Sequence, residues 1–246
     1  SRPLFNRVLQ GGYEPGSTLK PFVALAGLEL GLRTPRDTTF SSGAFKLPGH
    51  EREYRDWRRG GHGHVDLKEA MAQSVNTYFF QLAVDLGIDR FSQYMARFGF
   101  GQPTGLIGLP EAAGIMPGPE WKFATYNEPW SSADTVHLSI GQGYLAVTPL
   151  QVARAIAAVA NWGTLYRPYL VEAIDANDQN PAQEFGPLAV GNLPVSQAHL
   201  TIIRDALLAV TTDTQFGTAW HRFTGLDIPV AGKTGTAETG IPGTNS

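Results

Sequence analysis

The sequence contains no cysteine and no long apolar run. Without cysteine, disulfide bonds and thiolate metal sites are excluded. No apolar stretch reaches the roughly 18 residues that a membrane-spanning helix needs, so the sequence predicts neither such a helix nor a signal peptide. The net charge is only −3, which gives no reason to predict nucleic acid or an anionic membrane surface as a partner.

What the sequence does contain predicts a mixed fold. The 246 residues suit a single domain, 1–246, with a sizeable core. Since helical and strand patterns are interleaved, we expect an α+β fold with an antiparallel sheet. Helices are predicted over 19–32, from 66 to 86, over 90–98, 148–162 and 196–211. Strands are predicted over 166–174 and 226–238, a long surface loop over 33–65, and loops over 99–134.

A serine and a lysine stand three residues apart where an apolar segment begins. Ser17 and Lys20 lie in PGSTLKPF, and the run down to residue 32 contains a single other charge, Glu29. Residues i and i+3 share one face of a helix, so the Lys20 amine can reach the Ser17 oxygen. Apolar burial lowers the pKa of a lysine, which turns it into a base for a serine nucleophile. The alternative is an ordinary helix N-cap beside a solvated lysine.

Two more short motifs carry polar side chains. SVN places the Ser74 hydroxyl and the Asn76 amide inside the predicted 66–86 helical stretch, which we expect to consist of two short helices that meet there. KTGT, starting at Lys233, offers a cation and two hydroxyls around a glycine on the predicted edge strand. A glycine there lets a ligand approach the backbone, and a free strand edge can pair with an extended peptide. Taken alone, each motif is more typical of a helix cap or a turn.

In the order S-x-x-K, S-x-N and K-T-G, the three motifs form the set found in penicillin-binding proteins and serine β-lactamases. The sequence resembles the transpeptidase domain of class B penicillin-binding proteins, and most of all the elongation type, penicillin-binding protein 2. The likeness extends over nearly the whole chain, through GGYEPGSTLKP, GHGHVDL, SVNTYFFQLAVDLGIDR, FGFGQPTGLIGLPE, IGQGYLAVTPLQVA and AGKTGTAE. It implies the penicillin-binding protein fold, an antiparallel sheet flanked by helices with an all-helical subdomain.

The resemblance implies a role for the first two motifs in acyl transfer. Ser17 would attack the D-Ala-D-Ala amide of a peptidoglycan stem peptide, and Lys20 would take the Ser17 proton. Ser74 would pass a proton towards the leaving D-alanine. Asn76 would bind the substrate backbone and hold Lys20. β-Lactams would acylate the same serine and remain there, because little in the site activates water.

The third motif would complete the site. By the same resemblance, Lys233 would keep the field positive and favour a neutral Lys20. Thr234, Gly235 and Thr236 would form the substrate-binding segment, with the two hydroxyls on the terminal carboxylate of the substrate. Backbone N–H groups of Ser17 and Thr236 would make the oxyanion hole. No cofactor is implied.

The resemblance also implies partners and a location. Relatives work on the extracytoplasmic (periplasmic) face of the cytoplasmic membrane, anchored by an N-terminal helix, with a membrane glycan polymerase and elongation scaffold proteins as partners. They carry a pedestal domain before the transpeptidase domain, and further strands and a closing helix after KTGT. We therefore expect the domain of this sequence to be incomplete at both ends.

Two alternative functions stay open at this point. The motifs also fit a serine β-lactamase, although neither Glu111 nor Glu128 has a context that marks it as the base for deacylation. They fit a penicillin-sensing receptor domain as well. Some relatives hold a metal with Asp, His and Cys, but the absence of cysteine excludes that full set. The remaining cluster of Asp56, His62, His64 and Asp66 is weak, and we predict no metal.

Overall fold

The computed structural model describes residues 4–176 and 181–237. Its helices are α1 (Arg7–Gln10), the 3-10 helix η1 (Gly16–Leu19), α2 (Lys20–Glu29), α3 (Leu67–Ala72), α4 (Asn76–Arg97), α5 (Pro119–Tyr126), α6 (Ser132–Ser139), α7 (Pro149–Ala160), α8 (Gln197–Thr212) and α9 (Trp220–Phe223). The strands pair antiparallel in twos: β1 (Thr39–Ser41) with β4 (Gly63–Val65), β2 (Ala44–Lys46) with β3 (Glu53–Arg55), β5 (Thr164–Arg167) with β8 (Leu188–Asn192), and β6 (Ala173–Ile174) with β7 (Gln183–Glu184). The predicted α+β class with antiparallel pairing is confirmed.

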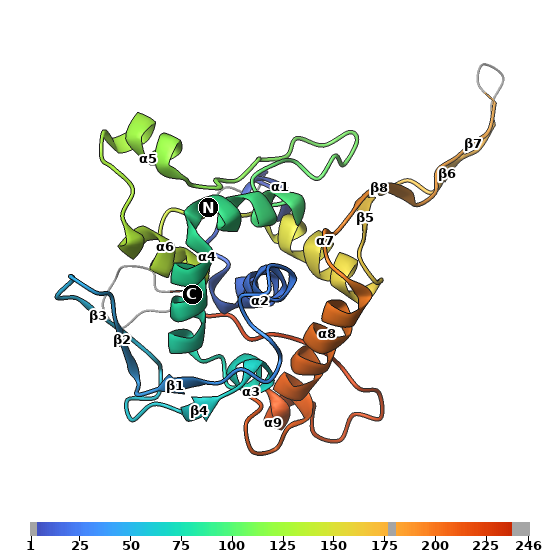
Figure 1. Ribbon diagram of the computed structural model, residues 1–246. Coiled ribbons are helices and arrows are strands. Elements are labelled where there is room, and N and C mark those ends of the chain that lie inside the picture. Colours follow the sequence, from blue (N-terminus) through green and yellow to red (C-terminus); the bar gives the residue numbers. More distant parts are fainter. Residues whose placement is uncertain (1–3, 177–180, 238–246) are drawn as a thin grey trace.

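Helix α2 forms the centre of the molecule, as its apolar sequence predicts. In Figure 1, α3, α4, α7 and α8 surround α2, which is seen nearly end-on. Every residue of α2 from Lys20 to Leu28 is buried. The centre of the Phe22 ring lies 5.3 Å from the centre of the Phe98 ring and 5.1 Å from that of the Phe100 ring. Because Lys20 begins this helix, the core fixes the position of its backbone.

Most helix starts follow their local signals. Asp66 and Glu69 form a capping box at the start of α3, and Thr148 and Gln151 form one at the start of α7. Ser196 caps α8 through the N–H of His199. The break predicted after residue 86 is a kink, because α4 continues past Gly87, which alone is non-helical.

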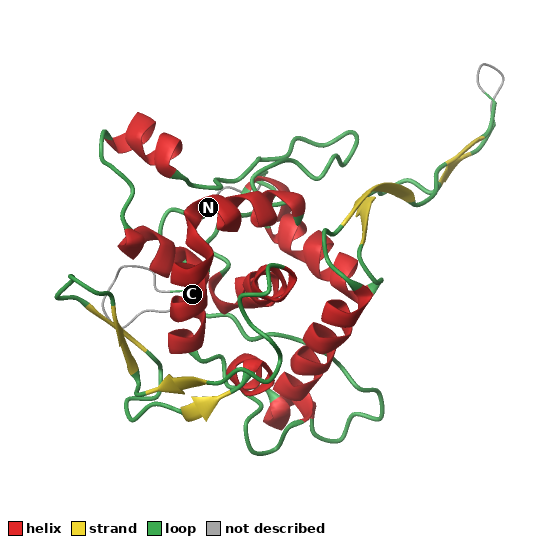
Figure 2. Ribbon diagram, in the orientation of Figure 1, coloured by secondary structure: helices red, strands yellow, loops and turns green. Residues whose placement is uncertain are grey.

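Within the described residues, the strands lie in two places (Figure 2). Within 33–65, predicted as one long loop, the structure has the β1–β4 and β2–β3 pairs. The strand predicted over 166–174 is split, because Pro168 lacks an N–H for a ladder; β5 ends before it and β6 begins at Ala173. Figure 1 shows β5, β8, β6 and β7 as an arm that projects from the body. Helix α5 lies in the range predicted as loop.

The prediction of a strand over 226–238 is wrong for residues 226–237, whose backbone is irregular. Glu238 lies outside the described residues. The reason is that helix α8 satisfies part of this backbone in place of a neighbouring strand. The N–H of Gly232 donates to the Leu207 carbonyl at 3.1 Å, and the Thr211 hydroxyl donates to the Val230 carbonyl. Pro229 has no N–H to donate.

No helix within the described ranges combines the length and the apolar character needed to cross a membrane.

Candidate active site

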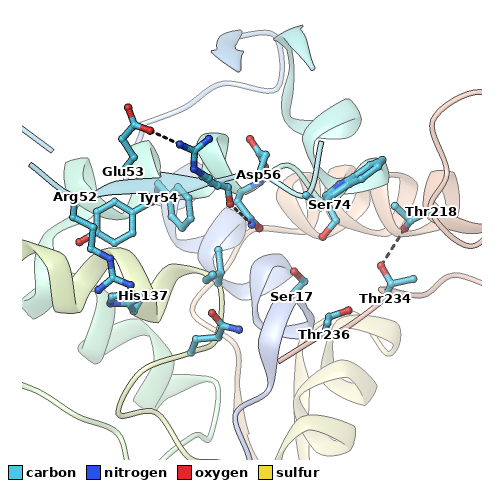
Figure 3. Close-up of a pocket in the computed structure, with 16 residues that line it drawn as sticks. Ser17, Arg52, Glu53, Tyr54, Asp56, Ser74, His137, Thr218, Thr234 and Thr236 are labelled. Carbon is cyan, nitrogen blue, oxygen red and sulfur yellow. Dashed lines mark hydrogen bonds and ion pairs between the residues drawn. The ribbon is translucent and has the colours of Figure 1, made fainter. Parts of the chain in front are cut away.

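The three sequence motifs meet at one pocket of about 800 Å³. Its lining includes five of the predicted residues: Ser17, Ser74, Asn76, Thr234 and Thr236. In the close-up of Figure 3, the hydroxyls of Ser17, Ser74, Thr234 and Thr236 surround a common space. Segments that lie far apart in the sequence therefore present their polar groups to the same volume.

Lys20 lies beneath this pocket, with a side chain that is 0% exposed. Its Nζ donates to the Ser74 carbonyl at 2.8 Å, to Ser74 Oγ at 3.2 Å and to Asn76 Oδ1 at 2.7 Å. It also lies 5.2 Å from the centre of the Phe79 ring. Ser17 is the residue whose carbonyl accepts the N–H of Lys20, so the two motif residues are one turn apart. The amine is held by the second motif, with no hydrogen bond to the Ser17 hydroxyl.

Burial is the main reason that the pKa of Lys20 lies well below its ordinary value. The positive charge of Lys233 lowers this pKa further, and the negative charge of Asp56 opposes the shift. A lysine with such a depressed pKa loses its proton at a lower pH than an ordinary lysine, and in that form it can accept a proton.

Ser74 occupies the junction between α3 and α4 in a left-handed conformation, with φ of 56°. Such backbone is costly for a residue other than glycine and is concentrated at functional sites. Val75, which is 0% exposed, anchors the junction in the core, and the N–H of Ser74 donates to the Met71 carbonyl at 3.2 Å. The prediction that this motif lies where two helices meet is confirmed.

The third motif forms the opposite side of the pocket and is more exposed. The Thr234 hydroxyl lies 3.1 Å from that of Thr218, and Lys233 Nζ donates to the Thr234 carbonyl at 3.1 Å. Lys233 itself lines a neighbouring, mostly apolar pocket, and burial lowers its pKa to about 7. Gly235 packs against Thr18: a Cβ at this position would lie 2.8 Å from Thr18 Cγ2.

A close backbone approach joins the first and third motifs. Gly16 has φ of +56°, and a Cβ there would lie 2.5 Å from the Thr236 carbonyl oxygen and 3.2 Å from the Thr236 nitrogen. The N–H of Gly16 donates to the Gly141 carbonyl at 2.9 Å. Only glycine fits this conformation and this space, so the backbones of Ser17 and Thr236 lie beside each other at the pocket.

The far end of the pocket was missed by sequence reasoning. It is lined by side chains from the 33–65 segment and from α6, among them Arg52, Tyr54 and His137. The Tyr54 ring lies 5.7 Å from the Phe80 ring and 5.3 Å from the His137 ring. The available signal was Tyr54, a large aromatic residue in a polar stretch, which indicates a segment that is partly buried; its side chain is 5% exposed.

The histidines of the weak cluster serve other contacts. His62 Nδ1 lies 3.0 Å from Gln73 Oε1, within hydrogen-bond distance. The ring centres of His64 and Phe40 are 5.1 Å apart. Asp66 caps α3. Within 4–176 and 181–237, no three His, Asp or Glu side chains gather as metal ligands.

Comparisons with known proteins agree with this geometry. Residues 1–246 match the family described as the penicillin binding protein transpeptidase domain. The chain is 39% identical over 238 residues to the peptidoglycan D,D-transpeptidase MrdA of Haemophilus influenzae, a match that covers 97% of this chain and 36% of that protein. The chain therefore spans little more than a third of that relative.

Two solved structures are similar over almost the whole chain. Pseudomonas aeruginosa PBP2 in complex with WCK 5153 has 41% identity and a TM-score of 0.86, over 97% of this chain and 53% of that one. Helicobacter pylori PBP2 in complex with MreC has 31% identity and a TM-score of 0.82, over 96% of this chain and 42% of that one.

Proposed function

This chain belongs to the penicillin-binding protein transpeptidase domain family, and from this we infer that it is a serine-type D,D-transpeptidase that cross-links peptidoglycan stem peptides. The matches to MrdA and to PBP2 structures confirm the resemblance to penicillin-binding protein 2. One observation carries the proposal. The fully buried Lys20 is hydrogen-bonded to both polar residues of S-x-N, beside the pocket that Ser17 lines.

The acylation step uses Ser17 as the nucleophile. Its Oγ attacks the carbonyl carbon between the two D-alanines, and its proton passes to Lys20 Nζ. The side chains stand one turn apart, and catalytic hydrogen bonds of this kind often tighten only when substrate binds. Because Ser74 Oγ is 3.2 Å from Nζ, it can relay a proton to the leaving nitrogen as the C–N bond breaks. D-Alanine leaves, and an ester to Ser17 remains.

The backbone and the third motif stabilise this reaction. The N–H groups of Ser17 and Thr236, brought together by the approach at Gly16, donate to the developing oxyanion. Thr234 and Thr236 bind the terminal carboxylate, and Asn76 binds the substrate backbone. Lys233 keeps the local field positive, which supports the neutral form of Lys20.

The amine of a second stem peptide then attacks the ester. The new amide bond forms, Ser17 Oγ leaves with a proton, and the cross-link is complete. β-Lactams acylate the same oxygen. We place the protein on the extracytoplasmic face of the cytoplasmic membrane, in cell-wall elongation. We also propose a membrane glycan polymerase and a scaffold protein as its partners, of which the PBP2–MreC complex is a precedent for the second.

Two assays test the proposal. Intact-protein mass after incubation with a penicillin, followed over time, should show a stable adduct on the parent and none on Ser17→Ala. Incubation with a donor and an acceptor stem peptide should then release D-alanine and give a cross-linked product.

Each contrary outcome has a different meaning. An adduct that disappears while the drug is consumed would identify a β-lactamase. A stable adduct without any cross-linked product would favour a penicillin-sensing receptor. A folded protein that forms no adduct would refute the acyl-serine mechanism.

A further inference from the structure

Asp56 holds a buried carboxylate next to the site, in the loop that follows β3. The residue is 6% exposed. Its Oδ2 accepts the Thr77 hydroxyl at 2.7 Å, the Ser41 hydroxyl at 3.0 Å and the Thr77 N–H at 3.3 Å. Its Oδ1 accepts the N–H of Asn76. Burying a carboxylate is costly unless its oxygens are hydrogen-bonded, and these neutral donors fulfil that need.

The carboxylate replaces a cap that α4 lacks. The N-cap residue of α4 is Val75, whose side chain cannot accept a hydrogen bond. The first N–H groups of a helix have no partner within the helix, and a negative charge near them is favourable. Asp56 supplies both the acceptors and the charge from a position 20 residues earlier in the sequence.

The same loop orients the Asn76 side chain. Asn76 Nδ2 donates to the Arg55 carbonyl at 3.2 Å, while Oδ1 accepts from Lys20 Nζ at 2.7 Å. Residues 55 and 56 therefore hold Asn76 at two points, one on its backbone and one on its amide. With Nδ2 engaged by the loop, it is the oxygen that faces the lysine.

We propose that Asp56 is a positioning residue for the acyl transfer inferred above. It fixes the start of α4 from outside the helix, and through Asn76 it fixes the amine of Lys20. This inference rests on the proposed function, because Lys20 is the base only if Ser17 is the nucleophile.

The charge of Asp56 gives the inference a distinctive readout. Two charged groups act on Lys20, Lys233 from the third motif and Asp56 from the β3–β4 loop; the other neighbours are the Phe79 ring of α4 and the neutral groups of Ser74 and Asn76. The Asp56 charge favours protonated Lys20. Removing it therefore lowers the pH above which Lys20 is a free base.

The test measures the rate at which a penicillin acylates Ser17 as a function of pH. Asp56→Asn keeps the size of the side chain but removes its charge and turns an NH₂ towards groups that donate. We expect the plateau rate to fall about 10-fold, since small misplacements of catalytic groups are costly. The acid limb of the profile should move to lower pH by about one unit.

Asp134→Asn is the matched control. Asp134 also caps a helix, α6, and also accepts several hydrogen bonds, including one from Lys122 at 2.8 Å. Its loss should lower the melting temperature and leave the acid limb in place. An Asp56→Asn profile that matches this control, with its limb unmoved, would overturn the positioning role and leave the proposed function intact. No adduct on the folded parent would overturn both.

A second variant covers the case in which Asp56→Asn does not fold. Thr77→Val keeps the shape of the side chain and the charge of Asp56, and removes the 2.7 Å hydrogen bond. We expect acylation to slow about 3- to 10-fold, because a less firmly held Asp56 leaves Asn76 and the Lys20 amine slightly misplaced. An unchanged rate in folded Thr77→Val would count against the inference.

Discussion

The two sides of the pocket are built in different ways. The buried side consists of Lys20, Ser74 and Asn76, which are joined by hydrogen bonds between positions 54 and 56 residues apart in the sequence. The outer side is the 233–236 segment, where Lys233 bonds mainly to its own neighbour, Thr234. One side is held by the core of the molecule, and the other by a single length of irregular backbone.

The two lysines show what this difference means for catalysis. Lys20 is enclosed and held by both residues of S-x-N, so its geometry is fixed before any substrate arrives. Lys233 is partly buried, and its pKa of about 7 leaves its charge sensitive to pH near neutrality. Under the proposed mechanism, the buried side supplies a preorganised base, and the outer side supplies a positive charge and backbone groups that bind substrate. The substitutions below separate these contributions.

The largest effect should come from the buried side. Lys20→Met keeps an unbranched chain in the core but removes the amine, leaving Asn76 Oδ1 without its lysine donor. Loss of the base should slow acylation by a penicillin about 10³-fold. Intact-mass time courses give the rate, and a thermal melt checks that the variant is folded. A folded variant that acylates at nearly the parent rate would mean that Lys20 is not the base.

The next largest effect is expected from a substitution where the two sides of the pocket meet. In Gly16→Ala the new Cβ would lie 2.5 Å from the Thr236 carbonyl oxygen. A backbone atom cannot move away from this contact as easily as the end of a side chain can. The oxyanion donors should be displaced, and acylation should fall about 100-fold. Gly31→Ala is the control, because Gly31 has a similar φ of +65° with nothing within 4 Å. It should cost about 1–2 kcal/mol of stability and leave acylation unchanged. Equal losses of acylation in both variants would argue against a role for the close contact between the Gly16 and Thr236 backbones.

The sequence predicts the local parts of this design and misses the distant ones. The capping boxes at Asp66 and Thr148 depend on residues three apart, so both could be predicted. The three motifs could be recognised together by their resemblance to a family. The hydrogen bonds between Lys20 and Ser74, however, are tertiary contacts that no local pattern predicts. Asp56 could not be assigned to α4, because nothing near it in the sequence marks a helix that begins 20 residues later.

Propensity also failed where tertiary contacts decide the conformation. The β-branched character of 226–237 predicts a strand, yet this backbone is hydrogen-bonded to α8 at Leu207 and Thr211. Helix α5 has the proline at its first position that often begins a helix. The sequence nevertheless predicts a loop here, because glycine and proline are dense around this segment and its apolar pattern is weak.

A smaller effect should come from the charge of the outer side. Lys233→Met removes a positive charge that disfavours protonated Lys20, so the pKa of Lys20 rises and the acid limb of acylation moves to higher pH. Because Lys233 itself has a pKa of about 7, the parent and the variant should differ most below neutral pH. There we expect a loss of about 10-fold. Lys68→Met, a change on the exposed face of α3, should leave the profile unmoved. A limb that moved to lower pH would contradict the argument.

The smallest effect should come from Gly235→Ala, and it can be reversed. The new Cβ would lie 2.8 Å from Thr18 Cγ2 but 3.4 Å from the nearest backbone atom, the Pro15 carbonyl oxygen. A methyl group can shift where a backbone cannot, so we expect acylation to fall only about 3-fold. Thr18→Ser removes that methyl group and keeps the hydroxyl that donates to the Pro15 carbonyl at 2.6 Å. The double variant should therefore regain the parent rate, and the coupling between the two changes measures the contact. If Thr18→Ser does not restore the rate, the loss in Gly235→Ala comes from the backbone of the outer side, and the segment is more rigid than its few hydrogen bonds indicate.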